Sequence, residues 1–179
     1  MQPVSISING RDVPLTLTAA ALFDLYERYG VSDNLLQSTG ALEDTPDGRR
    51  ACARLVALLA EQAELRRRRL GHTPRTIPDE DEIFAGGSWD LLRYAASVAV
   101  RQGFARSVRK NEPKTVNLVL AARAEHPDAS TEALRIGLLT VCAVRLHLSP
   151  ADALLLTPGE YLDMLDTLAP DRDEEQEVI

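Results

Sequence analysis

The stretch LSPADALLLTPGEYLDML, residues 148–165, carries the same helix-start signal twice. Ser149 and Thr157 can each accept a hydrogen bond from an orphan backbone N–H, and each is followed by a proline, whose missing N–H costs nothing at the first helical position. Asp152 and Glu160 stand at the third helical position, where an acid completes a capping box. The spacing predicts a short helix of about two turns, a corner, and then a longer final helix.

The residues before this corner carry the most apolar helical pattern of the chain. Ser130 is a helix-start residue, and TEALRIGLLTVCAVRLHL, residues 131–148, follows it with apolar side chains on nearly every face. A helix that is apolar all round is normally buried on all sides. We therefore expect this segment to be the central buried helix. We also expect the corner to turn the chain so that Leu162 and Leu165 pack inward while Tyr161 and the acids face outward.

The first half of the chain begins with a hairpin signal and continues with helical patterns. Alternating apolar and polar residues flank Asn9-Gly10, a dipeptide that favours the tight turn of a β-hairpin. Thr18 and Ser88 are each expected to cap a helix, and Gly71 to end one. The predicted helices cover residues 19–29, 49–70, 89–102 and 115–126, and an acidic connector at 79–82 is expected to form one turn.

These patterns predict a mainly α protein, a multi-helix fold with a small N-terminal β-hairpin. Charge and proline interrupt the helical pattern near residues 110–114. We therefore expect a hairpin-plus-helix module over 1–109 and a C-terminal helical module over 110–170. Residues 171–179 form an acidic tail with too little apolar content to fold, so we expect them to be disordered.

The charges of the chain are segregated along the sequence. The chain has 179 residues, 45% of them apolar, which is enough for a core, and its net charge is −7. Residues 49–75 hold eight arginines and two glutamates, whereas residues 125–179 hold twelve acids and three arginines. An acidic protein is a poor partner for nucleic acid, and segregated charge favours salt-sensitive binding to other proteins or self-association as a homo-oligomer.

The sequence offers no constellation of residues typical of an enzyme. The three histidines, His72, His126 and His147, have no partner at the spacing of a metal motif. Cys52 and Cys142 lie in apolar helical patterns, where a thiol is more often a buried hydrophobic group than a nucleophile. We predict no catalytic residues, no cofactor and no metal, and no enzyme activity.

The chain also lacks the signals of export or membrane insertion. The N-terminal residues do not combine a basic region with an apolar run, and no segment approaches the roughly 20 apolar residues of a membrane span. We expect a soluble, cytoplasmic protein that does not enter a membrane.

Four features are candidates for partner binding. The run Arg66 to Arg69 is explained either by cations favoured in the last turn of a helix or by docking to an acidic partner surface or RNA. Trp89, the only tryptophan, is either a core anchor or an interface hot spot. Tyr161 and Leu165 pose the same alternatives, and their helical spacing favours the core.

Taken together, these segments resemble the tail assembly chaperones of long-tailed bacteriophages. The most specific part is the double helix start, in which Leu148-Ser149-Pro150-Ala151-Asp152 and Leu156-Thr157-Pro158-Gly159-Glu160 match a corner common in that family. Residues 4–104 are similar to the family's N-terminal module, and residues 115–168 resemble the extension that a translational frameshift adds in many such viruses. Both parts lie in one chain here, which fits either a frameshift product or an undivided gene.

The resemblance implies a protein of the host cell cytoplasm that is not an enzyme. It would bind the long, aggregation-prone tape measure protein, keep it soluble, help recruit tail tube protein, and be absent from the mature virion. The alternative is a small helical nucleic-acid-binding regulator of phage origin, in which the C-terminal corner acts as a helix-turn-helix. Acids at 152, 160, 163 and 166 would face phosphate in that arrangement, which disfavours it.

Overall fold

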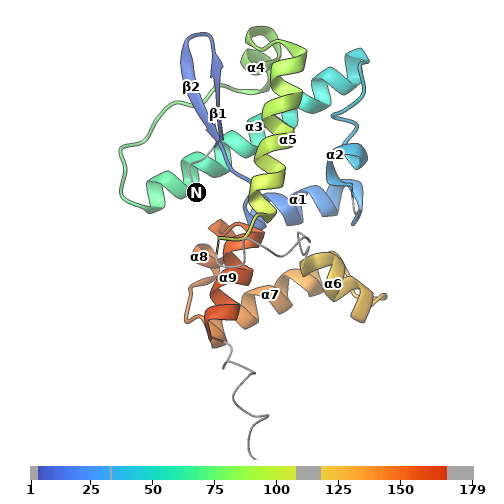
Figure 1. Ribbon diagram of the computed structural model, residues 1–179, viewed down its shortest axis with the longest axis vertical. Coiled ribbons are helices and arrows are strands. Elements are labelled where there is room, and N and C mark those ends of the chain that lie inside the picture. Colours follow the sequence, from blue (N-terminus) through green and yellow to red (C-terminus); the bar gives the residue numbers. More distant parts are fainter. Residues whose placement is uncertain (1–3, 33, 108–117, 169–179) are drawn as a thin grey trace, which may run out of the picture.

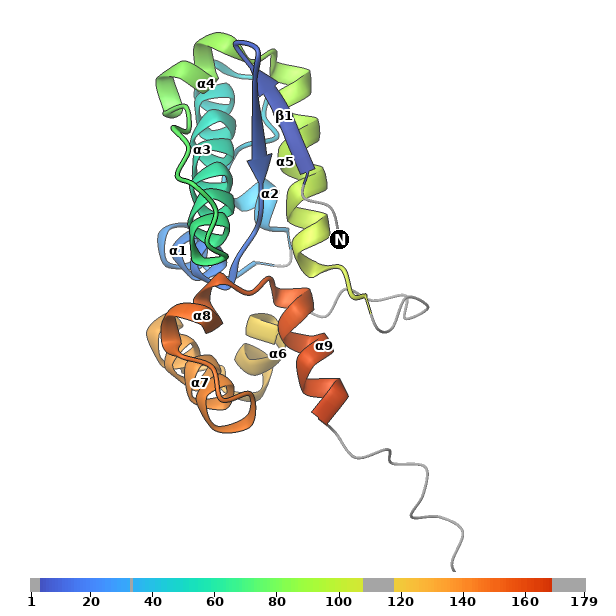
Figure 2. The same cartoon turned by 90° about the vertical axis from the view of Figure 1, so that its left-hand side faces the viewer.

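The protein is mainly α-helical with one N-terminal hairpin, as the sequence predicts. This computed structural model describes residues 4–32, 34–107 and 118–168, which contain nine helices and a two-stranded sheet (Figure 1). The expected boundary near 110–114 and the acidic tail at 171–179 lie outside the described residues. The described elements form an upper part, which contains the hairpin, and a lower part built from the last four helices (Figure 2).

The hairpin forms where the turn signal predicts it. Strands β1 (Val4–Ile8) and β2 (Arg11–Leu15) pair antiparallel, with Ile6 opposite Val13. Asn9 and Gly10 between them have φ angles of 51° and 74°, the left-handed pair that a tight two-residue turn requires. One face of the hairpin is buried against the helices and carries the side chains of Ile6, Ile8, Val13 and Leu15.

The helices of the upper part surround the larger core, to which Val119 and Leu134 of the lower part also belong. These helices are α1 (Ala19–Tyr29), α2 (Leu35–Ser38), α3 (Pro46–Arg69), α4 (Glu80–Gly86) and α5 (Trp89–Phe104). Helices α3 and α5 run beside the hairpin and enclose most of the core with it (Figure 2). Helix α2 was not predicted, and α3 begins three residues earlier than expected because Thr45 caps it and Pro46 takes the first position.

The lower part contains the double helix start. Its elements are α6 (Leu118–Glu125), α7 (Thr131–Arg145), α8 (Pro150–Leu155) and α9 (Pro158–Leu168). A second, smaller core is built on Cys142, Ala153 and Tyr161. The prediction that Tyr161 faces outward is wrong, and the alternative that it belongs to the core is confirmed: only 6% of this residue is exposed, and it packs with Cys142 and Ala153. Leu165 is partly buried and packs on the same cluster, as expected.

The prediction of a central buried helix at 131–148 is also wrong. Helix α7 lies between α6 and the pair α8 and α9 (Figure 1), but within it only Leu134 and Cys142 are buried. Ile136 and Val144 are 54% and 66% exposed. The pattern misled because a helix that is apolar all round has no polar face to mark its exposed side, so the sequence cannot show that one apolar side is uncovered.

The predicted caps divide into those that form and one that does not. The Thr18 hydroxyl accepts the Ala21 N–H at 3.3 Å, and the Ser149 and Thr157 hydroxyls accept the N–H groups of Asp152 and Glu160, each at 3.2 Å. Ser88 precedes α5 as expected but makes no side-chain cap bond.

Candidate partner-binding site

The two parts of the molecule share the larger core through Val119 and Leu134, and they also meet at a polar junction, where the C-terminal end of α3 faces the starts of α8 and α9. Arg66 donates from Nη1 and Nη2 to the two carboxylate oxygens of Glu160, at 2.7 and 2.5 Å. Arg69 donates from Nε and Nη2 to Asp152, at 2.6 and 2.9 Å. The two arginines lie three residues apart and so project from one face of α3, while the two acids are the third residues of α8 and α9. The double helix start thus places two carboxylates opposite two arginines.

The other two arginines of the run bond to a buried carboxylate on their own helix. Arg67 and Arg68 donate to Glu64 at 2.9 and 2.8 Å, and the backbone N–H of Arg75 donates to the same group at 2.8 Å. The Glu64 side chain is only 4% exposed. The hydrogen bond from Arg68 has the largest effect on the Glu64 pKa and, together with the bond from the Arg75 backbone, lowers it to about 2. All four arginines of the run therefore bond to carboxylates of the same chain.

A third ionic contact lies on the other side of the junction. Arg106, just after α5, bonds to both Asp163 and Asp166 of α9, and the Ser107 N–H donates to Asp163 at 2.6 Å. The Arg106 side chain is 8% exposed and that of Asp163 is 11% exposed, so this contact is largely shielded from water. Acids of the C-terminal half thus neutralise arginines of the first half within one molecule.

Backbone contacts fix the same junction at close range. The Ala19 N–H at the start of α1 donates to the carbonyl of Leu156, at the corner between α8 and α9, at 2.8 Å. A Cβ added at Gly159 would lie 2.1 Å from the carbonyl oxygen of Ala105. Only glycine permits this approach of α9 to the end of α5, so the corner is fitted closely to the upper part.

The acidic connector at 79–82 is likewise engaged within the chain. It begins α4 through a capping box between Asp79 and Glu82, as its composition allows. Arg50 pairs with Asp81 at 2.8 Å and Arg54 pairs with Glu80 at 3.3 Å, which holds α4 on the first half of α3. The sequence predicts a turn here, but sequence spacing does not show which arginines face these acids.

A cavity of about 380 Å³ opens at the junction, between the end of β2, the ends of α3 and α5, and the start of α9. Leu15, Leu17, Ala63, Leu70 and Ala99 form its apolar lining, and Arg66, Arg67, His72, Gln102 and Glu160 form its polar lining. We call this cavity the junction pocket.

Trp89 stands apart from the junction, at the start of α5. Its side chain is partly buried and packs against the larger core. The Arg93 guanidinium lies over the ring, 5.7 Å from its centre. This placement agrees with the core-anchor interpretation, and the structure does not bring Trp89 together with the arginine run or with Tyr161.

An uncovered apolar surface lies on α7. Ala133, Ile136, Gly137, Thr140 and Val144 recur at helical spacing and are all exposed. The Thr140 hydroxyl donates to the Ile136 carbonyl at 2.9 Å, which leaves its methyl group to face solvent. These five residues, the α7 face, extend about 16 Å along the helix and include no charged residue. Sequence reasoning missed them because it assigned the whole helix to the core.

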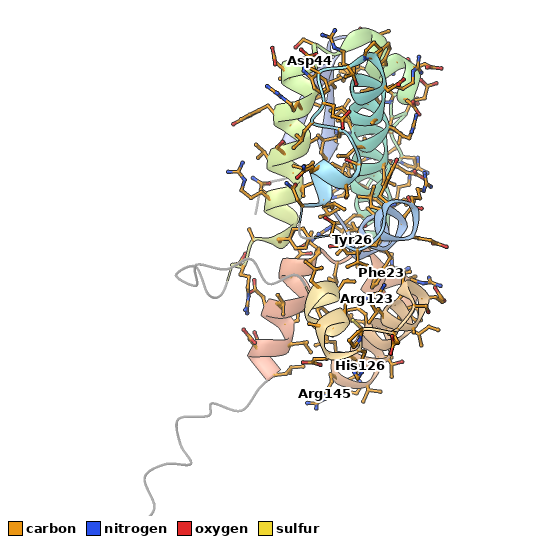
Figure 3. All side chains as sticks on the ribbon, turned by 90° about the vertical axis from the view of Figure 1, so that its right-hand side faces the viewer. Phe23, Tyr26, Asp44, Arg123, His126 and Arg145 are labelled. Atoms are coloured by element: carbon orange, nitrogen blue, oxygen red, sulfur yellow. The ribbon has the colours of Figure 1, made fainter. Side chains whose placement is uncertain are left out.

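Figure 3 relates the lower part to the rest of the molecule. Phe23 and Tyr26 of α1 lie at the boundary between the two parts, whereas Asp44 lies at the far end of the upper part. Phe23 and Tyr26 are buried, 4% and 1% exposed. Arg123, His126 and Arg145 lie in the lower part, on the side away from Asp44.

The described residues hold no grouping of side chains suited to a metal ion. Cys52 and Cys142 are completely buried, and burial raises the pKa of each thiol to about 11. A thiol with so high a pKa is a weak nucleophile at neutral pH. Among the described helices, none combines the length and apolar character that crossing a bilayer requires.

No known protein family, curated protein or solved structure matches this chain.

Proposed function

We propose that this protein is a tail assembly chaperone of a long-tailed bacteriophage. In this proposal it binds the tape measure protein in the host cell cytoplasm, keeps it soluble, helps recruit tail tube protein, and is absent from the mature virion. The observation that carries the proposal is the uncovered α7 face. The resemblance of the double helix start to that family is the reason for proposing the tape measure protein as the partner.

The α7 face has the properties required for binding an apolar helix. Its exposed residues recur every three to four positions, so they form a stripe that can pack along a partner helix. Gly137 in the middle has open space around its Cα, which allows a second helix to approach closely. A tape measure protein presents a long apolar helical stripe before the tail tube surrounds it, and such a stripe aggregates unless it is covered.

The junction supports the proposal by holding α7 in place. Helix α7 packs against α8 and α9 in the smaller core. Helices α8 and α9 are in turn bonded to α3 by two ion pairs. A binding surface on a rigid frame loses less conformational freedom when it binds than a mobile one. The arginine run thus acts in this proposal as a support for the binding surface rather than as the surface itself.

Co-expression tests the proposal. The tape measure protein encoded by the same viral genome should be insoluble alone and should co-purify as a soluble complex with this chain. Substituting Ile136→Glu and Val144→Glu together should abolish that solubilisation, because two charges would be desolvated in the interface. The double variant should keep its melting temperature, because both side chains are already more than half exposed.

A matched pair on the upper part provides the control. Leu91 and Tyr94 of α5 are 43% and 68% exposed, and Leu91→Glu with Tyr94→Glu should leave the complex intact. If the tape measure protein were equally insoluble with and without this chain, the proposal would be wrong. Retardation of duplex DNA by the chain at physiological salt would then favour the nucleic-acid-binding regulator.

A further inference from the structure

We propose that the junction pocket binds the acidic segment of the same chain, residues 169–179. This segment follows α9 and lies outside the described residues. Its sequence is APDRDEEQEVI, in which five acids and one arginine precede Val178 and Ile179. The proposed contact places Val178 and Ile179 in the apolar part of the pocket and the carboxylates beside the arginines at its mouth.

The pocket is lined by apolar side chains and by hydrogen-bond donors, which suits a ligand that has an apolar group next to carboxylates. Leu70 at the rim is 69% exposed, so a group that covers it would remove apolar surface from water. The polar lining includes hydrogen-bond donors: the guanidinium groups of Arg66 and Arg67, which also bond to Glu160 and Glu64, and the side chains of His72 and Gln102. Each guanidinium carries five N–H groups, more than these bonds use. Donors at the rim of an apolar pocket favour a ligand that carries carboxylates.

Charge around the pocket also favours an acidic occupant. The end of α3, the following loop and the residues just after α5 carry six arginines, and five carboxylates bond to this region among the described residues. The arginines are Arg66, Arg67, Arg68, Arg69, Arg75 and Arg106, and the carboxylates are those of Glu64, Asp152, Glu160, Asp163 and Asp166. These groups leave an excess of one positive charge at the junction, which attracts a segment of net negative charge.

The segment is long enough to return to the pocket. Glu160 lines the pocket and Leu168 ends α9, eight residues or about 12 Å further along the helix. Val178 lies ten positions after Leu168, and an extended chain over that distance spans about 33 Å. The segment therefore has more than twice the length it needs to run back along α9.

Paramagnetic NMR on the full chain tests the inference. A nitroxide attached at Gln176→Cys labels the segment selectively, because Cys52 and Cys142 are completely buried. The amide signals of Leu70, His72 and Gln102 should broaden relative to a diamagnetic label. Broadening should be lost on Val178→Ser with Ile179→Ser, and also in about 1 M salt, where the screening length falls to about 3 Å.

Variants of the pocket and mixed samples give the remaining outcomes. Leu70→Ser should reduce the broadening, whereas Tyr94→Ser, at a position that is equally exposed but far along α5, should not. In a mixed sample, one chain carries the spin label without isotope and the other carries the isotope without a spin label. The isotope-labelled chain should show no broadening if the contact is within one molecule. Absence of broadening at the pocket in the full chain, or its appearance in the mixed sample through a second copy, would overturn the inference.

Discussion

Arg66 of α3 and Glu160 of α9, 94 residues apart, form an ion pair with two hydrogen bonds of 2.7 and 2.5 Å. The Glu160 oxygen Oε2 also accepts the Thr157 N–H at 3.0 Å, which completes the capping box of α9. One carboxylate thus begins a helix and bonds that helix to the other part of the molecule.

We expect this ion pair to contribute a coupling energy of about 1 kcal/mol, because it is bidentate and partly shielded from water. A double-mutant cycle with Arg66→Ala and Glu160→Ala, followed by urea unfolding, measures the coupling, and the lost cap cancels in the cycle. The pair Arg49–Asp44, with both side chains more than half exposed, should couple by less than about 0.5 kcal/mol. Equal coupling energies in the two cycles would show that the Arg66–Glu160 pair contributes no more than an exposed ion pair.

The caps at the corner should each be measurable as stability. Ser149→Ala and Thr157→Ala each remove a side-chain acceptor from a helix start and should lower the free energy of unfolding by about 1 kcal/mol. Ser88→Ala should change it little, because Ser88 makes no cap bond. A cost at Ser88 as large as at the corner would contradict the observed geometry. Thermal unfolding of the three single variants provides the comparison.

Two glycines should respond to alanine in opposite directions. Gly159→Ala would place a methyl group 2.1 Å from the Ala105 carbonyl oxygen and should destabilise the protein by about 1–3 kcal/mol. Gly137→Ala meets no atom within 4 Å and should stabilise α7 by up to about 1 kcal/mol through higher helix propensity. Melting temperatures should shift down for the first variant and up for the second. A neutral Gly159→Ala would mean that the close approach does not exist in solution.

Stability should fall as the solution becomes acidic. The Glu64 pKa is about 2 in the folded protein and 4.5 without these contacts, so the folded state binds fewer protons between these values. Its contribution to stability is complete above about pH 4.5 and is lost as the pH falls towards 2. Arg69 likewise lowers the pKa of Asp152 to about 2, which adds to the loss in the same range.

Unfolding in urea at pH 6 and pH 3 measures this dependence. Glu64→Gln should lower the free energy of unfolding at pH 6. The further fall in this free energy from pH 6 to pH 3 should be smaller in the variant than in wild type. Glu61→Gln, at an exposed position with no ion pair among the described residues, should retain the full pH dependence. Identical pH dependence in wild type and Glu64→Gln would rule out the role of this carboxylate.

Much of the fold was predictable because its signals are local. The left-handed turn at Asn9-Gly10 and the caps at Thr18, Ser149 and Thr157 depend on residues within about four positions of one another. The exposed side of α7 was not predictable. Burial depends on which elements pack against a helix, and an apolar residue has the same sequence signature whether or not a neighbour covers it.

The sequence by itself determined where the helices of the corner start, since Ser-Pro-x-Asp and Thr-Pro-x-Glu satisfy their own backbone N–H groups. It also contained the charges that join the two parts, but not their pairing. Only the tertiary structure decided that Arg66 meets Glu160 and Arg69 meets Asp152, because the chain carries many arginines and many acids. Partners so far apart are chosen by the packing of the apolar cores and the close fit at Gly159, which bring one face of α3 over two helix starts.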